Sequence, residues 1–185
     1  LKIDISVHDF LIPVMYSAFS TWRVGQFKQP NSLEELGSTR NNDFISKSMV
    51  TNTFGIARRL GAELATEGRN WTVTGTWFGR ELTRNLARGS GFGARASWAP
   101  MLELDEAGNA DFLHLGLSAV SQDTSADTLR LRARPGADLT PIRLVDTGAL
   151  TTTDRMTTLG AEAAWAHGPL LLQGEAYQAR VQRTV

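Results

Sequence analysis

The sequence predicts an all-β protein whose antiparallel strands run up and down in turn, as in a transmembrane β-barrel. Three observations favour this fold class. Apolar and polar residues alternate in several segments, short and long connections follow one another between those segments, and two tryptophans in one segment are spaced like the two edges of a membrane. A barrel strand needs only about 9 to 11 residues with apolar side chains at alternate positions, which is a weak signal per segment.

The alternation begins at residues 1–8, where apolar and polar residues take strict turns. Residues 10–16 are more continuously apolar and contain Pro13, so the sequence gives them no clear assignment. Residues 22–28 form the next expected strand. Residues 59–65 alternate again, which places their leucines on the face opposite arginine and glutamate.

The segment WTVTGTW at 71–77 places Trp71, Val73, Gly75 and Trp77 on one face and three threonines on the other. At about 3.3 Å per residue the two tryptophans are roughly 20 Å apart along the strand. That separation approximates the height of the apolar band between the two aromatic girdles of a membrane barrel.

Four further strands are expected in the second half of the chain. Residues 91–104 begin with Phe92, Ala94, Ala96 and Trp98 on one face. Residues 112–121 follow, and residues 156–166 and 170–179 form a closing hairpin. This count gives seven or eight strands in total.

The lengths of the connections alternate along the chain. The short connections are 18–21, 67–70, 105–110 and 167–169, and the long ones are 29–53, 79–90 and 122–155. An up-and-down barrel with brief turns at one end and long loops at the other produces this order. A soluble β-sandwich does not require it, but seven connections can sort this way by chance. The alternation alone therefore leaves both architectures open.

Composition restricts the chemistry. The chain of 185 residues carries 19 basic and 19 acidic residues, so no net field favours nucleic acid. Arginine supplies 16 of the basic residues and lysine 3. Arginine binds phosphate through a rigid fork, although genomic base composition explains this bias equally well. The absence of cysteine excludes disulfide and thiol chemistry. No apolar run reaches the length of a transmembrane helix.

The run GQFKQPNSLEELGSTR at 25–40 changes character at Pro30. Ser32 and Glu35 have the spacing of a capping box, which predicts a short helical turn inside a long loop. The run ends in Ser38, Thr39 and Arg40. Two hydroxyl donors beside a planar cation suit an oxyanion, whereas an ordinary surface loop with a capped turn is the alternative interpretation.

The run LRLRAR at 129–134 predicts a strand with Arg130, Arg132 and Arg134 on one face. Like charges spaced by about 6.6 Å repel one another unless anions or acids lie between them. The array indicates either an anion path or a solvated strand whose arginines pair with acidic residues, for which the candidates are Asp123, Asp127 and Asp138.

The sequence does not favour an enzyme. The three histidines lie far apart and lack metal-ligand spacing. The run GSGFGA at 89–94 leads into alternation and not into a helix, so it lacks the context of a dinucleotide loop. We therefore expect no catalytic residues, no metal and no cofactor.

The run at 25–40 resembles the signature of the phosphate-selective porin O and P family, which are bacterial outer-membrane channels for phosphate-type anions. The remaining similar runs are RRLGAEL (58–64), FLHLGLS (112–118), LRARP (131–135), VDTGAL (145–150) and GPLLLQGEAY (168–177). The chain departs from the family pattern at Asn31, where an aromatic residue is usual, and at Ser46, where an acid is usual. Lys47 keeps a positive charge in place of the usual arginine.

The resemblance implies that residues 1–185 are a single domain that forms part of a larger barrel, of 16 strands, in a longer parent chain. It implies a homotrimer in the outer membrane of a Gram-negative bacterium that passes phosphate or polyphosphate passively. In the family the third external loop, which matches residues 29–53 here, folds inward as a constriction.

The resemblance also implies a set of anion-binding residues. They are Lys28, Ser38, Thr39, Arg40 and Lys47 at the constriction, with Arg130, Arg132 and Arg134 as a ladder of inward arginines. A carboxylate, Glu34 or Glu35, would keep binding weak enough for release. The alternative function is a soluble or surface β-sandwich that binds anionic ligands through the arginine strand.

Overall fold

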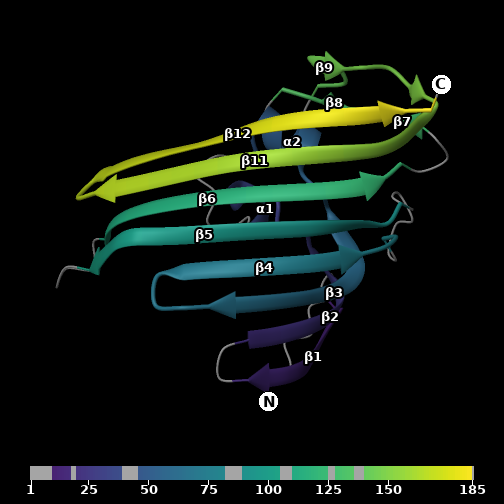
Figure 1. Ribbon diagram of the computed structural model, residues 1–185. Helices are drawn as coiled ribbons and strands as arrows, with labels where there is room; N and C mark the ends of the chain where they lie inside the picture. Colours follow the sequence, from purple (N-terminus) through teal and green to yellow (C-terminus); the bar gives the residue numbers. More distant parts are fainter. Residues whose placement is uncertain are drawn as a thin grey trace.

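The computed structural model describes residues 10–17, 20–38, 46–81, 89–104, 110–124, 128–135 and 140–184. These residues form one eight-stranded antiparallel sheet, two small two-stranded sheets and two short helices (Figure 1). The main sheet has the strand order β1-β2-β3-β4-β5-β6-β11-β12. Neighbours in the sheet are therefore neighbours in the chain, except where the segment between β6 and β11 leaves the sheet.

The strands of the main sheet are β1 (Phe10–Ser17), β2 (Ser20–Lys28), β3 (Arg58–Glu67), β4 (Trp71–Phe78), β5 (Gly91–Leu104), β6 (Ala110–Asp123), β11 (Thr153–His167) and β12 (Leu170–Arg183). The helices are α1 (Leu33–Leu36) and α2 (Met49–Phe54). The small sheets pair β7 (Thr128–Leu129) with β10 (Leu150–Thr151) and β8 (Arg132–Ala133) with β9 (Val145–Asp146).

Apart from residues 129–134, the expected strands from residue 22 onward are present in the main sheet. The segment around Pro13, which the sequence left without assignment, is β1 and pairs with β2 through a register shift between Pro13 and Met15. Proline has no N–H to give to a ladder, and an edge strand with an irregularity tolerates that loss. The alternating residues 1–8 lie outside the described residues.

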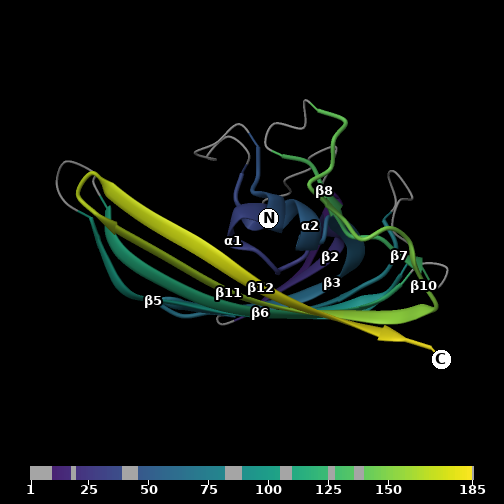
Figure 2. The same cartoon turned by 90° about the horizontal axis from the view of Figure 1, so that it is seen from above.

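The main sheet is a single curved layer (Figure 2). It is open, with β1 and β12 at its two edges. The links from β3 to β4 and from β11 to β12 lie at one end of the strands, and the long segments that follow β2, β4 and β6 leave from the other end (Figure 1). The up-and-down order is thus confirmed. The β-sandwich alternative is wrong for the described residues, because no second large sheet packs on the first.

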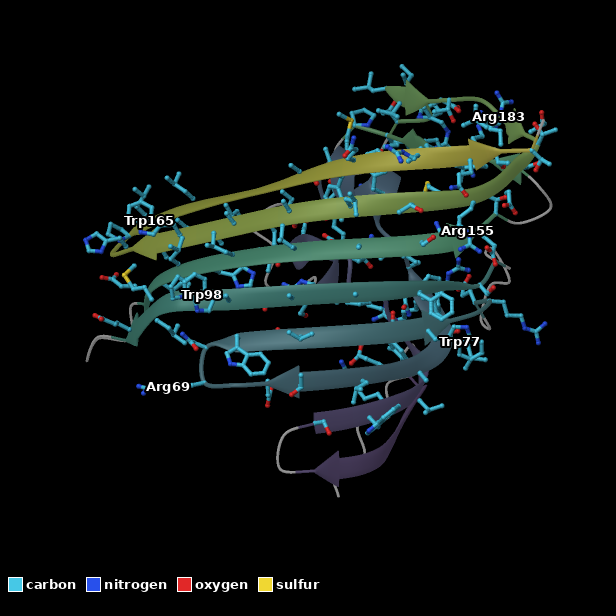
Figure 3. The ribbon with its side chains drawn as sticks, in the orientation of Figure 1. Arg69, Trp77, Trp98, Arg155, Trp165 and Arg183 are labelled. Carbon is cyan, nitrogen blue, oxygen red and sulfur yellow. The ribbon has the colours of Figure 1, made fainter. Side chains whose placement is uncertain are left out.

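The convex outer face of the sheet is apolar. On β4, Trp71, Val73 and Trp77 are 42%, 45% and 55% exposed, as the alternation predicts. Trp71 pairs across the ladder with Trp98, and Trp77 pairs with Phe92. These two aromatic pairs lie toward opposite ends of the strands (Figure 3 labels Trp77 and Trp98). An outward apolar band between two aromatic rows is the arrangement of a membrane barrel.

The concave inner face carries the buried core of the described residues. Ile56, Phe78 and Val120 form an apolar cluster there, and Phe78 has no exposed surface. Helices α1 and α2 lie within the concavity (Figure 2). The core therefore forms between the sheet and a loop that covers its inner face.

Candidate functional site

The segment between β2 and β3, residues 29–57, is called the inner loop here; residues 39–45 of it lie outside the described residues. The Ser32 hydroxyl accepts a hydrogen bond from the Glu35 N–H at 3.0 Å and caps α1. This confirms the expected helical turn. The Glu35 carboxylate accepts a bond from Lys47. A salt bridge to Lys47 thus exists although Ser46 replaces the usual acid.

Helix α2 was not predicted from the sequence. Ser48 caps it, because the Ser48 hydroxyl accepts a bond from the Thr51 N–H at 3.2 Å. The third residue of the helix is Thr51 and not Glu or Gln, so the capping-box pattern is missing. The only local signal was a single serine before a short run of residues with modest helix propensity.

The two helices are braced against each other. The Glu34 carboxylate accepts bonds from the Ser48 N–H at 3.0 Å and from its hydroxyl at 2.9 Å. The Asn31 side chain, which is buried, donates to the Phe54 carbonyl at 2.9 Å and accepts from the Ile56 N–H at 3.3 Å. Asn31, where the family usually has an aromatic residue, thus links the two ends of the inner loop.

The inner loop is also attached to the wall of the sheet. The Glu34 N–H donates to Glu175 Oε1 on β12 at 2.7 Å. The Ser118 hydroxyl on β6 donates to the Asn31 carbonyl at 3.4 Å. Pro30 rests over β5 at Gly93, where an added Cβ would lie 3.6 Å from Pro30 Cδ. The loop therefore contacts three strands of the wall besides the two it joins.

The inner wall holds a cluster of charges that the sequence did not single out. Arg95 and His114 both contact the carboxylate of Glu162, the latter at 2.8 Å. The Glu162 side chain is only 4% exposed. It lies over Gly116 on the neighbouring strand, where a Cβ would approach Glu162 Oε1 to 2.4 Å. Glycine at position 116 thus makes room for the buried carboxylate.

Two further arginines lie on this inner face. Arg23 donates from Nε to Glu63 at 2.6 Å, directly across the β2–β3 ladder. Arg59 is 4% exposed, donates to Gln122 Oε1 at 3.1 Å and lies 5.5 Å from the centre of the Phe78 ring. A guanidinium over an aromatic face is a favourable contact. The sequence could have placed these residues on the inner face, because each of them alternates along its strand with outward apolar residues.

A cavity of about 900 Å³ lies between the inner loop and the wall. The loop side is formed by α1, the start of α2 and Ser38, and the wall side by β5, β6, β11 and β12. Lys47, His114 and Glu175 are among its polar lining residues. The cavity thus combines a mixed set of charges with apolar walls.

The expected anion-binding residues of the inner loop have different surroundings. Lys28 Nζ donates to the Glu35 carbonyl at 2.6 Å and to the Gly37 carbonyl at 2.9 Å, which satisfies carbonyls at the end of α1. Lys47 pairs with Glu35, and Ser38 is exposed beside the cavity. Thr39 and Arg40 lie outside the described residues.

The expectation of one continuous arginine strand at 129–134 is wrong. Arg130 lies between β7 and β8, Arg132 belongs to β8, and Arg134 follows it. β7 and β8 pair with different partners, β10 and β9, so no single ladder carries the three arginines. Between β7 and β8 the Leu131 N–H donates to the Thr147 hydroxyl at 3.1 Å, and the Leu131 carbonyl accepts from the Thr147 N–H at 3.0 Å.

Among the described residues, the acid that pairs with Arg130 is Asp146, which was not one of the three candidates. Arg130 Nε donates to Asp146 Oδ1 at 2.8 Å, and Nη2 donates to Oδ2 at 2.6 Å. This two-point bond, together with the Gly148 N–H, holds the pKa of Asp146 well below its ordinary value. Of the three candidates, Asp123 pairs with Arg155. Asp127 and Asp138 lie outside the described residues.

A curved antiparallel sheet with an apolar, aromatic-banded outer face, a charged inner face and a loop folded into its concavity defines the wall of a porin-type channel. The family model described as phosphate-selective porin O and P matches residues 14–185. The chain therefore belongs to this family of Gram-negative outer-membrane porins, which are channels and not enzymes. Comparisons with curated proteins and with solved structures give no match.

No helix in the described part of the chain combines the length and the apolar character that a membrane span requires. The same residues hold no group of three or more His, Cys, Asp or Glu side chains that could bind a metal ion.

Proposed function

We propose that this chain forms part of the wall and the constriction of a channel that passes phosphate or polyphosphate anions passively across the outer membrane. The observation that carries the proposal is the position of the inner loop within the concave, charged face of the sheet (Figure 2). A loop in that position narrows the path along the inner wall. Membership of the porin O and P family supports phosphate-type anions as the permeating species.

In this proposal residues 29–53 form the constriction, and the anion meets Ser38, Thr39 and Arg40. Arginine and hydroxyl donors replace part of the hydration shell of the anion, as a selectivity filter requires. Lys28 and Lys47 add positive charge from behind α1, although their described bonds go to the loop itself. Glu34 and Glu35 lie close by and keep anion binding weak enough for release.

Arg130, Arg132 and Arg134 act in this proposal outside the constriction, where their positive charges attract anions. Their effect is electrostatic and of longer range, so salt screens it. Because Asp146 neutralises Arg130, the net attraction of this segment is smaller than three arginines would give.

The decisive experiment is electrical recording from the full-length protein in planar bilayers. We expect an anion-selective reversal potential in a chloride gradient, and a chloride current that added phosphate blocks. A cation-selective current, or a current that phosphate leaves unchanged, would contradict the proposal.

We further propose a homotrimer in the outer membrane, as the family implies. The expected result on cell fractionation is a detergent-extracted outer-membrane protein that migrates as an oligomer until it is heated. A monomer in the soluble fraction would contradict both the location and the assembly.

A further inference from the structure

The side of the inner loop that faces β12 is held at two described points. The first is Glu175, whose Oε1 accepts the Glu34 N–H at 2.7 Å and whose Oε2 accepts the Tyr177 hydroxyl. Residues 34 and 175 are 141 positions apart in the chain. The Glu34 N–H belongs to the first turn of α1, where backbone donors lack partners within the helix. The carboxylate therefore ties α1 to the wall.

The second point is Tyr177, which reaches α2. Its ring stacks with that of Phe54, with ring centroids 6.0 Å apart and planes inclined by 20°. The ring also lies over Gly160 on β11, where an added Cβ would approach Tyr177 Cε1 to 3.0 Å. Glycine on the neighbouring strand thus lets the tyrosine lie along the wall and face the loop.

The bracing inside the loop makes these two points act together. Glu34 holds Ser48, and Glu35 holds Lys47, so α1 and α2 are joined where α2 begins. Elsewhere the described contacts of the loop are with β8, which lies against α2, and at the base of the loop, at Pro30, Asn31 and Ile56. Beside α1 and the start of α2 the cavity of about 900 Å³ separates the loop from β5, β6 and β12. On that side the loop has room to move.

We propose that Glu175 and Tyr177 form a latch, in which one strand holds both helices of the inner loop across this cavity and thereby sets the bore of the pore. The inference rests on the proposed function, because it assigns to these residues the positioning of the constriction. Glu175 and Tyr177 are positioning residues, since they act on the permeating anion through the loop.

The test is single-channel recording of full-length Glu175→Ala in planar bilayers. Loss of the acceptor for the Glu34 N–H frees α1, so we expect a higher mean conductance and more open-channel noise than in the wild type. Tyr177→Phe keeps the stack on Phe54 and removes the bond to Glu175, so it should give a smaller change in the same direction. Because Tyr177→Phe removes only one hydroxyl group, it keeps the test informative if Glu175→Ala does not fold.

The matched control is Glu162→Ala, which removes the same charge from the same inner wall. The described bonds of Glu162 go to Arg95 and His114 on the wall and not to the loop. Glu162→Ala should therefore change ion selectivity but leave the open-channel noise at the wild-type level. Equal noise in Glu162→Ala and Glu175→Ala would show that charge alone matters, and would overturn the latch.

A cross-link provides a rescue, because the chain contains no cysteine. In the variant Phe54→Cys with Tyr177→Cys the stack is lost and noise should rise; a short bismaleimide that bridges the two thiols should return it to the wild-type level. Wild-type noise in the unbridged variant and in Glu175→Ala would overturn the proposal. Phosphate block of the wild-type current, recorded in the same experiment, tests the channel function separately from the latch.

Discussion

The inner loop and the outer segment, defined as residues 124–152 between β6 and β11, both carry basic residues that were expected to attract anions. The two segments differ in the contacts that hold them in place. The inner loop lies on the concave wall, with buried Asn31 and the cluster around Phe78 at its base. The outer segment folds mainly on itself through Arg130 and Asp146, and β8 passes near α2. One segment is built into the wall, and the other consists of two short nested strand pairings, of which the β8–β9 pairing lies near α2.

The difference shows that a basic residue in a polar segment is not by itself an anion site. Lys28 and Lys47 bind groups of the inner loop, and Arg130 binds an acid of its own segment. What separates the two segments is their attachment to the wall. Changes in the inner loop should therefore alter the pore, whereas changes in the outer segment should alter only the approach of ions.

The largest effect is expected from Phe78→Ala, which empties the site beneath the inner loop. Deleting a fully buried phenylalanine costs about 3 to 5 kcal/mol of stability. The Phe78 ring also contacts the Arg59 guanidinium, so the substitution removes both this contact and the apolar packing at the base of the loop. We expect a lower urea concentration at the unfolding midpoint in lipid vesicles, together with a noisy channel current.

The outward neighbour Trp77 gives the matched comparison. Trp77→Ala removes an even larger aromatic side chain, which is 55% exposed on the outer face. It should weaken membrane anchoring and leave the current quiet. If Trp77→Ala disturbed the current as much as Phe78→Ala does, the inner loop would not depend on this core.

Much of the sheet could be predicted because the alternation of apolar and polar residues along a strand is a local property of the sequence. Residues 91–104 form β5 over the expected range, and Phe92 and Trp98 face outward as their alternation indicates. The strand hydrogen bonds only require that each strand pairs with its neighbour in the sheet, and short turns favour this at the β3–β4 and β11–β12 links. The outer face follows from the same rule.

The inner site could be predicted only in part, because it depends on contacts between distant strands. Arg95 was assignable to the inner face, but its meeting with Glu162 depends on the β5–β6–β11 register and on Gly116. The prediction of a single strand at residues 129–134 was wrong for a similar reason. Alternation at 129–134 suggested one strand, whereas the bonds of Leu131 to Thr147 and of Arg130 to Asp146, from residues 16 positions away, divide it.

Arg40→Ala should have the next largest effect if the inner loop is the constriction. Removing one charge-assisted hydrogen bond costs about 1.5 to 3 kcal/mol of anion binding, or about 10- to 150-fold in affinity. Added phosphate should then block the chloride current less effectively, while the yield of the oligomer stays normal. Arg69→Ala, in the short turn between β3 and β4, is the control for loss of charge (Figure 3). Unchanged phosphate block in Arg40→Ala would remove this residue from the binding site.

Arg130→Ala should have a smaller effect, confined to the rate of anion entry. The substitution leaves Asp146 as an unpaired negative charge, so entry should slow at low ionic strength and recover at high salt as screening shortens the field. Asp146→Asn leaves Arg130 unpaired and should speed entry by the same mechanism. Two variants that shifted entry in the same direction would contradict this account of the outer segment.

The smallest effect is a pH dependence that should exist only when the pair is broken. Arg130 holds the pKa of Asp146 well below its ordinary value of about 3.9. The contribution of the pair is therefore present above that ordinary value and is lost only as the pH falls through the lowered pKa. In Arg130→Ala the pKa of the Asp146 carboxyl should rise toward its ordinary value, although the bond from the Gly148 N–H still lowers it.

Single-channel currents at low salt, recorded between about pH 6 and about pH 3, would reveal this titration. Anion entry in Arg130→Ala should rise across this range, because protonation removes the unpaired charge of Asp146. The double variant Arg130→Ala with Asp146→Asn is the control, because it differs from Arg130→Ala only in lacking the titrating carboxylate. Any pH dependence that it retains comes from other groups. A rise of equal size in the double variant would place the titration elsewhere, and the exposed Arg130–Asp146 bond would then have no measurable influence on ions approaching the pore.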